Sequence, residues 1–250
     1  MLAEQRFEQI LQVLQQKRAV GVPELCKATG ASEATIRRDL NTLDRQGRLS
    51  KVHGGAVLPD SEFQRDEPDV ATKLQLFIAQ KDRIARHAAS LVRDDDVVFL
   101  DAGTTTVRMV DYLTGTGAIL VTNGIACAQQ MLNNHLNGFI LGGCLKPGTD
   151  AIVGTGAVSD LSRYNFTKAF LGINGITVRQ GFTTPDVEEA AVKTGAAARA
   201  QQVFVLADSS KFGIVTAATV LPIESASIIT EKLPEAKYQE HTTILEAKAK

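Results

Sequence analysis

The sequence lacks several features that would place it among other classes of protein. It has no Trp, and its three cysteines (Cys26, Cys127 and Cys144) form no CxxC pair. Because the cysteines are odd in number and the four histidines are scattered, the pattern favours reduced thiols over a disulfide framework or a zinc site. We therefore expect no metal and no cofactor.

The sequence also lacks any apolar run of the roughly 20 residues that a membrane span needs. It begins with a charged amphipathic stretch instead of a signal peptide, so we expect a cytoplasmic protein that does not contact a membrane. The net charge is only −1, but residues 1–58 hold nine Lys/Arg against six Asp/Glu, and the remainder holds eighteen against twenty-two. A modestly basic head before an acidic body fits a DNA-binding module with a partner domain.

Residues 1–58 predict a small helical domain that ends in a β-hairpin. Apolar side chains between Phe7 and Leu14 repeat at helical spacing, which indicates a first helix with one buried face. Pro23 and Ser32 are suited to open two further helices, and a His-Gly pair separates two short strands. The predicted elements are helices 4–16, 23–29 and 33–46 and strands 49–52 and 55–57.

The rest of the chain predicts a linker and a larger α/β domain. A polar, proline-bounded stretch lies within the linker, which we place at residues 59–72, and residues 73–250 alternate strands with helices around a largely parallel sheet. Helical spacing predicts one long helix, Phe77–Leu91, at the start of this domain, with Lys81 on its periodic face. The other predicted elements are strands 97–100, 119–121, 139–141, 169–171, 203–207 and 227–229 and helices 105–113, 125–132 and 188–200.

The third helix carries a candidate DNA-reading face. Ile36, Leu40 and Leu43 lie on one side, and the opposite side offers small, amide and guanidinium groups that fit a major groove. An exposed arginine pair is also consistent with a merely solvated helix. The ordered series of helix, Pro-initiated helix, Gly turn, capped helix and wing favours DNA binding. The candidate DNA-contacting residues are Ser32, Ala34, Thr35, Arg37, Arg38, Asn41, Arg45, Lys51 and His53.

Polar loops follow the predicted strands of the second domain. One Gly and three Thr at a strand–helix junction present N–H groups and hydroxyls to an anion, and such loops converge at the carboxyl ends of the strands. A short Gly/Thr loop is equally consistent with a plain turn, and Glu188 with Lys193 is consistent with a solvated helix start. The candidate effector-binding residues are Asp101, Gly103, Thr104, Thr105, Thr106, Thr122, Asn123, Gly142, Gly143, Lys146, Gly175, Asp186, Glu188, Lys193, Asp208 and Lys211.

Several blocks of residues resemble the DeoR family of bacterial transcriptional repressors, and together they extend over nearly the whole chain. The resemblance implies a winged helix-turn-helix DNA-binding domain (1–58) and a sugar-phosphate effector domain (73–250) whose ligand releases the operator. The stretch TTPDVEEA is most similar to fructose-operon repressors, which implies fructose 1-phosphate. The blocks are SEATIRRDLN (32–41), HGGA (53–56), FLDAGTTT (99–106), GFTTPDVEEAAVK (181–193) and LADSSKFG (206–213).

The second domain also resembles, more distantly, ribose-5-phosphate isomerase and the CoA-transferase-like fold, which raises a sugar-phosphate isomerase with a DNA-binding head as an alternative. Such an enzyme needs a carboxylate base. An ungapped count back from Asp208–Lys211 places the isomerase's glutamate on Lys193, which supplies no base, although Glu188 or Glu189 could replace it. We therefore expect a sensor without catalytic residues.

The expected partners follow from the DNA-reading helix and the anion loop. They are double-stranded operator DNA, a phosphorylated sugar and further copies of the chain. One reading helix contacts too few bases for operator specificity, so we expect a homo-oligomer, either a dimer or a tetramer. An architectural nucleic-acid protein is a third possible class, which would bind DNA without any response to metabolites.

Overall fold

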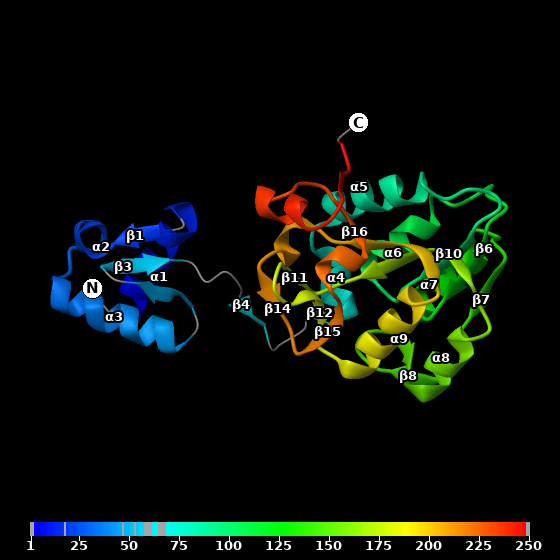
Figure 1. The fold of residues 1–250 in the computed structure, drawn as a ribbon, viewed down its shortest axis with the longest axis horizontal. Coiled ribbons are helices and arrows are strands. Elements are labelled where there is room, and N and C mark those ends of the chain that lie inside the picture. Colours follow the sequence, from blue (N-terminus) through cyan, green and yellow to red (C-terminus); the bar gives the residue numbers. More distant parts are fainter. Residues whose placement is uncertain are drawn as a thin grey trace. The chain divides into compact units, whose positions relative to one another are not determined.

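The computed structural model describes residues 3–17, 19–46, 48–52, 54–57, 62–64 and 69–248. The chain folds as two compact units, Met1–Phe63 and Gln64–Lys250 (Figure 1). The elements of the first unit, in chain order, are α1 (Ala3–Lys17), β1 (Ala19–Gly21), α2 (Val22–Thr29), α3 (Glu33–Arg45), β2 (Ser50–Val52), β3 (Gly55–Val57) and β4 (Glu62–Phe63).

The first unit confirms the expected helices and hairpin. The Ser32 hydroxyl caps α3 by accepting a hydrogen bond from the Thr35 N–H, and Gly30 ends α2 with a left-handed φ of 70°. The three helices bury a common core with the sheet. Its fully buried members include Ile10, Leu14, Leu25, Ile36, Leu40 and Leu43.

The strand β1 is a feature that the sequence did not predict. It pairs antiparallel with β3, which also pairs with β2, so the wing (the β2–β3 hairpin) is part of a three-stranded sheet. A side chain at Gly55 would lie 2.2 Å from the Val20 carbonyl oxygen, so only glycine permits this close approach. A strand of three residues is too short to show a period of its own.

The second unit contains α4 (Val70–Gln75) and α5 (Ile78–Ala89), followed by alternating strands and helices. The remaining elements are β5 (Val97–Leu100), α6 (Thr104–Val110), β6 (Ile119–Thr122), α7 (Ile125–Asn133), β7 (Gly138–Ile140), β8 (Cys144–Lys146), β9 (Ala151–Val153), α8 (Gly154–Leu161), β10 (Phe166–Gly172), β11 (Gly175–Thr177), β12 (Gly181–Thr184), α9 (Val187–Ala197), β13 (Ala200–Leu206), η1 (Ser209–Lys211), β14 (Ile214–Val215), β15 (Ala218–Leu221), η2 (Ile223–Ser225), β16 (Ser227–Thr230), η3 (Ala236–Glu240) and β17 (Ile244–Glu246).

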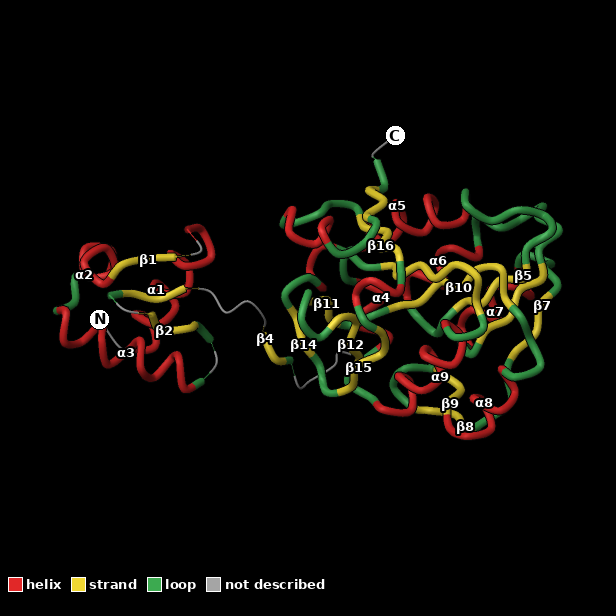
Figure 2. The backbone as a smooth tube through the Cα atoms, viewed as in Figure 1, coloured by secondary structure: helices red, strands yellow, loops and turns green. Residues whose placement is uncertain are grey.

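A seven-stranded parallel sheet forms the centre of this unit, in the order β17-β16-β13-β10-β5-β6-β7 (Figure 2). Alternate residues of each strand face opposite sides, so Phe99 joins one core cluster while Val98 and Leu100 join the other. Helices α5, α6 and α7 pack on the side of Val98, and α8 and α9 pack on the side of Phe99. The expected α/β class with a parallel sheet is confirmed.

The strand order reverses between β5 and β10. Connections from β5 lead outward to β6 and β7, whereas β10 leads outward to β13, β16 and β17. The loops at the carboxyl ends of these two central strands therefore diverge and leave a crevice between them. This switch point is where an open α/β sheet places its ligand.

The helix expected over Phe77–Leu91 is present as α5, Ile78–Ala89, and a second helix, α4, that the sequence did not predict precedes it. Two helices, α4 and α5, are separated at Phe77, which has a left-handed φ of 54°. The helix α5 buries Ile84 and Ala88 in the core of the second unit, so it is part of the sheet domain. The helix α4 begins inside the proposed linker 59–72 and buries none of its side chains.

Candidate functional sites

The exposed face of α3 presents the residue types that were expected to read DNA. Ile36, Leu40 and Leu43 have no exposed surface, whereas Arg38 and Asn41 lie on the solvent side of the helix. Ala34, Arg37, Arg45 and Lys51 are also exposed, and Thr35 is half-buried. His53, which was also expected to contact DNA, lies outside the described residues.

Hydrogen bonds already engage several of these side chains. Arg37 forms an ion pair with Glu33 one turn away on α3, at 2.6 Å between Nη2 and Oε1. The Ser32 and Thr35 hydroxyls share a hydrogen bond of 2.9 Å, so they serve first as the cap of the helix. The ammonium of Lys51 donates to Asn41 Oδ1 at 2.7 Å.

An ion pair on the inner side of α3 was missed from the sequence. Asp39 follows the two arginines and is only 6% exposed. Arg6 of α1 donates to both of its carboxylate oxygens, with Nη2 at 3.0 Å from Oδ1, and the Asp39 carboxylate raises the pKa of Arg6. The position of Asp39, a charged residue on the apolar side of the helix, could have indicated a buried ion pair. This pair fixes α3 against α1.

A pocket lies at the switch point of the second unit, with an open volume of about 640 Å³ that is partly continuous with solvent. We call it the switch-point pocket. Loops after β5, β10 and β13 form its base, and side chains of α4, α5 and α9 close its sides. Its lining is Val70, Lys73, Lys81, Asp101, Ala102, Gly103, Thr104, Thr105, Thr149, Gly172, Ile173, Asn174, Glu189, Lys193, Leu206, Asp208 and Lys211.

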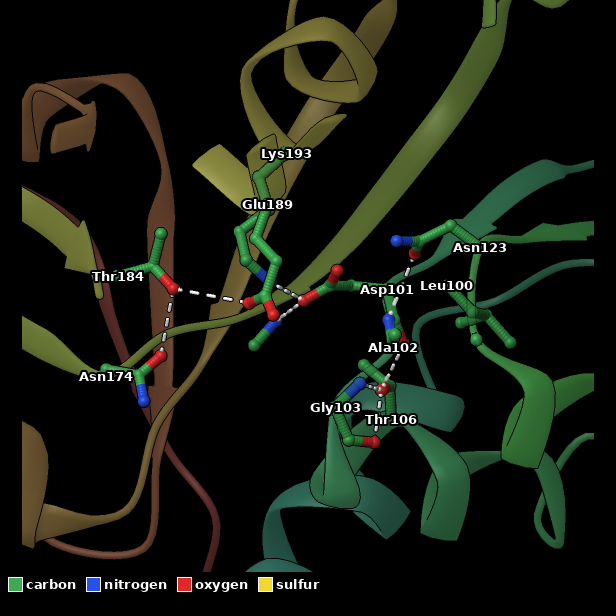
Figure 3. A network of polar contacts seen from close by, with 12 residues as sticks. Leu100, Asp101, Ala102, Gly103, Thr106, Asn123, Asn174, Thr184, Glu189 and Lys193 are labelled. Atoms are coloured by element: carbon green, nitrogen blue, oxygen red, sulfur yellow. Dashed lines mark hydrogen bonds and ion pairs between the residues drawn. The ribbon is translucent and has the colours of Figure 1, made fainter. Parts of the chain in front are cut away.

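Asp101, which follows β5, bonds across the crevice to the end of β10. Its Oδ2 accepts a hydrogen bond from the Gly172 N–H at 2.9 Å and forms an ion pair with Lys193 of α9 (Figure 3). Asp101 is 1% exposed and Lys193 is 5% exposed, so this pair forms the floor of the pocket. A lysine bound in this way neutralises the buried carboxylate.

Lys81 is a buried lysine of the pocket whose pKa is strongly lowered. It is 5% exposed, and its ammonium donates to the backbone carbonyl of Lys73 in α4. Burial lowers the pKa of Lys81, the nearby Asp208 opposes this, and the charges of Lys211, Arg108 and Lys73 add to it, so that together they bring the pKa to about 8. Three lysines therefore gather around one carboxylate at this end of the pocket.

Glu189 is the carboxylate that α9 contributes to the lining. Its Oε1 accepts from Lys146 at 2.8 Å, and Thr184 donates to its other oxygen at 3.5 Å (Figure 3). Burial raises the pKa of Glu189, but the charges of Lys193 and Lys146 outweigh burial and hold it below its ordinary value. Asp186 caps α9 by accepting from two N–H groups and also pairs with Lys146 at 3.0 Å.

The structure brings some of the candidate effector residues together in the pocket lining. These are Asp101, Gly103, Thr104, Thr105, Lys193, Asp208 and Lys211. Three others lie directly behind the lining. Thr106 is fully buried, and its hydroxyl accepts from the Gly103 N–H and donates to the Asp101 carbonyl. The Thr122 hydroxyl donates to the Leu100 carbonyl. The side-chain oxygen of Asn123 accepts a hydrogen bond from the Ala102 N–H at 3.1 Å.

The remaining candidates lie outside the lining. Gly142 and Gly143 are exposed before β8, and Glu188 is exposed at the start of α9. Gly175 allows close backbone packing, since a Cβ there would lie 2.3 Å from the Ile214 carbonyl oxygen. Lys146 pairs with Asp186 and with Glu189, and Glu189 lines the pocket.

Sequence reasoning missed Lys73, Lys81 and Asn174 as pocket residues. Lys81 stood on the periodic face of a predicted helix among apolar residues, and a lysine at such a position was the available signal. Asn174 follows β10, and its Oδ1 accepts from Thr184 at 3.1 Å (Figure 3). Lys73 lay next to the expected linker, where the sequence shows no helical or strand periodicity that would place its side chain.

Comparisons with known proteins agree with both units. Residues 6–62 match the model of the DeoR-like helix-turn-helix domain, and residues 77–232 match the DeoR C-terminal sensor domain. A Bacillus subtilis (strain 168) protein named "Uncharacterized HTH-type transcriptional regulator FruR" is 40% identical over 98% of each chain. This chain belongs to the DeoR family.

Other relatives of this DeoR-family chain are also transcriptional regulators. The HTH-type transcriptional regulator IolR of Bacillus subtilis (strain 168) is 32% identical over 92% of this chain and 91% of its own. The lactose phosphotransferase system repressor of Staphylococcus epidermidis is 32% identical over 83% of each. Among solved structures, ribose 5-phosphate isomerase A of Methanocaldococcus jannaschii overlaps 53% of each chain with a TM-score of 0.40 and 16% identity. An overlap this partial says nothing about activity.

None of the described helices has both the length and the apolar character needed to cross a membrane.

Proposed function

We propose that this DeoR-family regulator represses a sugar-catabolism operon and leaves its operator when a phosphorylated sugar occupies the switch-point pocket. One observation carries the proposal. In a chain with a DNA-binding head, Lys73, Lys81 and Lys211 converge in a pocket at the topological switch point of the sheet. We place the protein in the cytoplasm, where operator and sugar phosphate are both present.

The pocket offers separate chemistry for the two parts of a sugar phosphate. The three lysines can neutralise a phosphate dianion through charge-assisted hydrogen bonds, beside the Thr104 and Thr105 backbone. The carboxylates of the lining and the Asn174 amide suit sugar hydroxyls, which both donate and accept hydrogen bonds. A bound dianion would also raise the pKa of Lys81 back toward its ordinary value, because it stabilises the charged form.

Fructose 1-phosphate is our specific proposal for the ligand. The relative that is 40% identical over 98% of the chain carries the name FruR. The stretch TTPDVEEA, which is similar to fructose-operon repressors, forms the end of β12 and the start of α9. It carries Thr184 and Glu189, which are hydrogen-bonded at one side of the pocket.

We propose that the pocket senses its ligand without transforming it. Lys193 occupies the position expected for an isomerase's base, and its ammonium is bound by Asp101. Of the two glutamates that could replace this base, Glu188 is exposed outside the lining, which leaves Glu189. A general base works best when its pKa lies near the working pH, which for a glutamate requires a raised pKa. The charges of Lys193 and Lys146 instead lower the pKa of Glu189. Turnover of fructose 1-phosphate or ribose 5-phosphate by the purified protein would contradict this point.

We propose α4 as the element through which the pocket acts on the head. It begins within the last residues of the proposed linker, buries none of its side chains and contributes Lys73 to the lining. The helix α5 is fixed in the core of the second unit and is a poor candidate for movement. A phosphate that takes the Lys81 ammonium would compete with the Lys73 carbonyl, which loosens α4.

The experiment is thermal denaturation of the full-length protein with sugar phosphates, repeated in the presence of operator DNA. At 100 times its dissociation constant a specific ligand adds about 2.7 kcal/mol, and we expect this from fructose 1-phosphate but not from fructose. The same ligand should lower operator affinity. Arg38→Ala should weaken operator binding by about 1–3 kcal/mol and leave ligand binding intact. Lys211→Ala should weaken ligand binding and leave operator binding intact. Equal loss of both activities in either variant would contradict separate sites.

A further inference from the structure

The contact between the wing and α3 holds Lys51 at two points. The Lys51 N–H donates to Asp44 Oδ1 at 2.9 Å, and the Lys51 ammonium donates to Asn41 Oδ1 at 2.7 Å. Asp44 and Asn41 are three residues apart, so they are neighbours on the surface of α3. Lys51 therefore lies along the helix, beside the residues expected to read bases.

This contact fixes the orientation of the Asn41 amide. An ammonium group can only donate hydrogen bonds, so the atom of Asn41 that faces Lys51 is its oxygen. The amide nitrogen, Nδ2, then points away from Lys51, and it makes no hydrogen bond within the part of the chain that the structure describes. Asn41 is exposed, so Nδ2 can donate to a base edge.

Amide orientation matters because the two purines differ in one group of the major groove. Adenine presents the N7 acceptor and the N6 amino donor, and an asparagine reads it with both oxygen and nitrogen. Guanine presents two acceptors, N7 and O6. With its oxygen turned toward the ammonium, the Asn41–Lys51 pair offers N–H donors from Nδ2 and from Lys51 itself. These match guanine and oppose the amino group of adenine.

We propose that Lys51 determines base specificity: by occupying one lone pair of Asn41 Oδ1 it leaves the pair with more donors than acceptors for a base edge, which selects guanine over adenine. The inference rests on the proposed DNA-reading role of α3. It assigns to the wing a part in sequence readout, beyond contact with the sugar–phosphate backbone. It also accounts for the position of Lys51, which is bonded to α3 at both its backbone and its ammonium.

The test uses the full-length protein and a randomised double-stranded DNA library. Sequences selected by the wild type are changed one base pair at a time, and the position read by Asn41 is the one at which Asn41→Ala removes the preference. We expect guanine there, favoured over adenine by about tenfold. Lys51→Met should abolish or reverse this preference, and Lys51→Arg should retain it because a guanidinium can still donate to Oδ1.

Two controls isolate the interaction. Lys27→Met removes an exposed lysine of the same unit from α2 and should leave every base preference unchanged. In an Asn41→Ala background, Lys51→Met should cause no further change in preference at that position. Thermal denaturation of each variant checks that the first unit remains folded.

Three outcomes would overturn the inference. In the first, Lys51→Met weakens binding equally for all sequences and lowers the salt dependence by about one ion, which identifies Lys51 as a phosphate contact. In the second, the wild type prefers adenine at the position read by Asn41. In the third, the wild type selects no sequence from the library, and the proposed DNA-reading function then fails together with the inference.

Discussion

Replacing Lys81 with methionine should stabilise the folded protein at pH 7 while removing its response to a phosphorylated ligand. The pKa of Lys81 falls from 10.5 to about 8 on folding, and one pKa unit corresponds to about 1.4 kcal/mol. The buried ammonium therefore destabilises the folded state by at most about 3.5 kcal/mol. Because this group faces the open pocket, solvent screening reduces the cost by roughly half.

The substitution also removes the hydrogen bond from Lys81 to the Lys73 carbonyl, which costs about 1 kcal/mol. The net gain at pH 7 is then about 0.5–2 kcal/mol. For a domain of this size, 1 kcal/mol raises the melting temperature by about 2–4 °C. Methionine matches the length of the lysine stem, so the change leaves no large cavity.

The pH dependence separates this charge effect from packing. Below pH 8 both the folded and the unfolded chain carry the Lys81 charge, so the wild type bears the full cost. Between pH 8 and 10.5 the folded chain releases its proton first, and wild-type stability rises relative to the variant. Above pH 10.5 the charge contributes no difference. The advantage of Lys81→Met should therefore be largest at pH 7 and fade as the pH approaches 10.5.

Calorimetry of the full-length protein at pH 7 and pH 10 measures this directly, with and without fructose 1-phosphate. Lys232→Met is the matched control, because Lys232 is exposed in the same unit, and it should change stability by less than about 0.5 kcal/mol. The reasoning is refuted if Lys81→Met lowers the melting temperature at pH 7, or if its effect is the same at both pH values. A variant that still gains stability from the ligand would refute the phosphate-binding role.

Three further substitutions, one of them with a matched control, test the two units by denaturation. Gly55→Ala should destabilise the first unit by about 1–3 kcal/mol because its methyl group meets a strand carbonyl, whereas Gly21→Ala has room and should cost little. Asn123→Ala should cost about 2 kcal/mol and weaken effector binding, because two hydrogen bonds behind the pocket are lost. Lys168→Met should cost about 3 kcal/mol at pH 7 by leaving the buried Asp96 unpaired.

The stability of the Lys168→Met variant at low pH provides a second test of the ion pair. Burial raises the pKa of Asp96, but the hydrogen bonds from Lys168 and Thr167 outweigh burial and hold it below 3.8. A carboxyl with a lowered folded pKa contributes stability above its unfolded pKa and loses it as the pH falls. The deficit of the variant should therefore narrow below about pH 4, and a constant deficit would contradict the assignment.

The elements that could be predicted from sequence are those with long periodic patterns or caps. The helix α3 has both, with Ser32 at its start and a buried face through Leu43, and the central strands are continuous apolar runs. The antiparallel sheet of β11, β12 and β15 has neither. Its strands are three or four residues long, and β11 and β12 are buried on both faces, so they show no alternation.

The pocket was predicted only in part for a related reason. Thr104, Thr105 and Thr106 look equivalent in the sequence, but the first turn of α6 directs the third hydroxyl back to Gly103 as a cap. Helix geometry could have separated it from the other two. Lys81 could not be assigned in this way, because its surroundings come from α4, β13 and η1, which only the tertiary fold brings together.

The proposed coupling through α4 has an energetic limit that bears on oligomerisation. Reversing a 1:99 equilibrium requires a ligand to prefer one arrangement by about 10⁴-fold, or about 5.5 kcal/mol. Within one pocket the ligand gains charge-assisted bonds worth about 1.5–3 kcal/mol each, but many of these form in either arrangement of α4. The contact that differs between the two arrangements of α4 is that of the Lys81 ammonium, which binds either the Lys73 carbonyl or the phosphate. We infer a coupling of about tenfold to a hundredfold per pocket, so complete release from the operator requires the ligand to act on at least two copies of the chain.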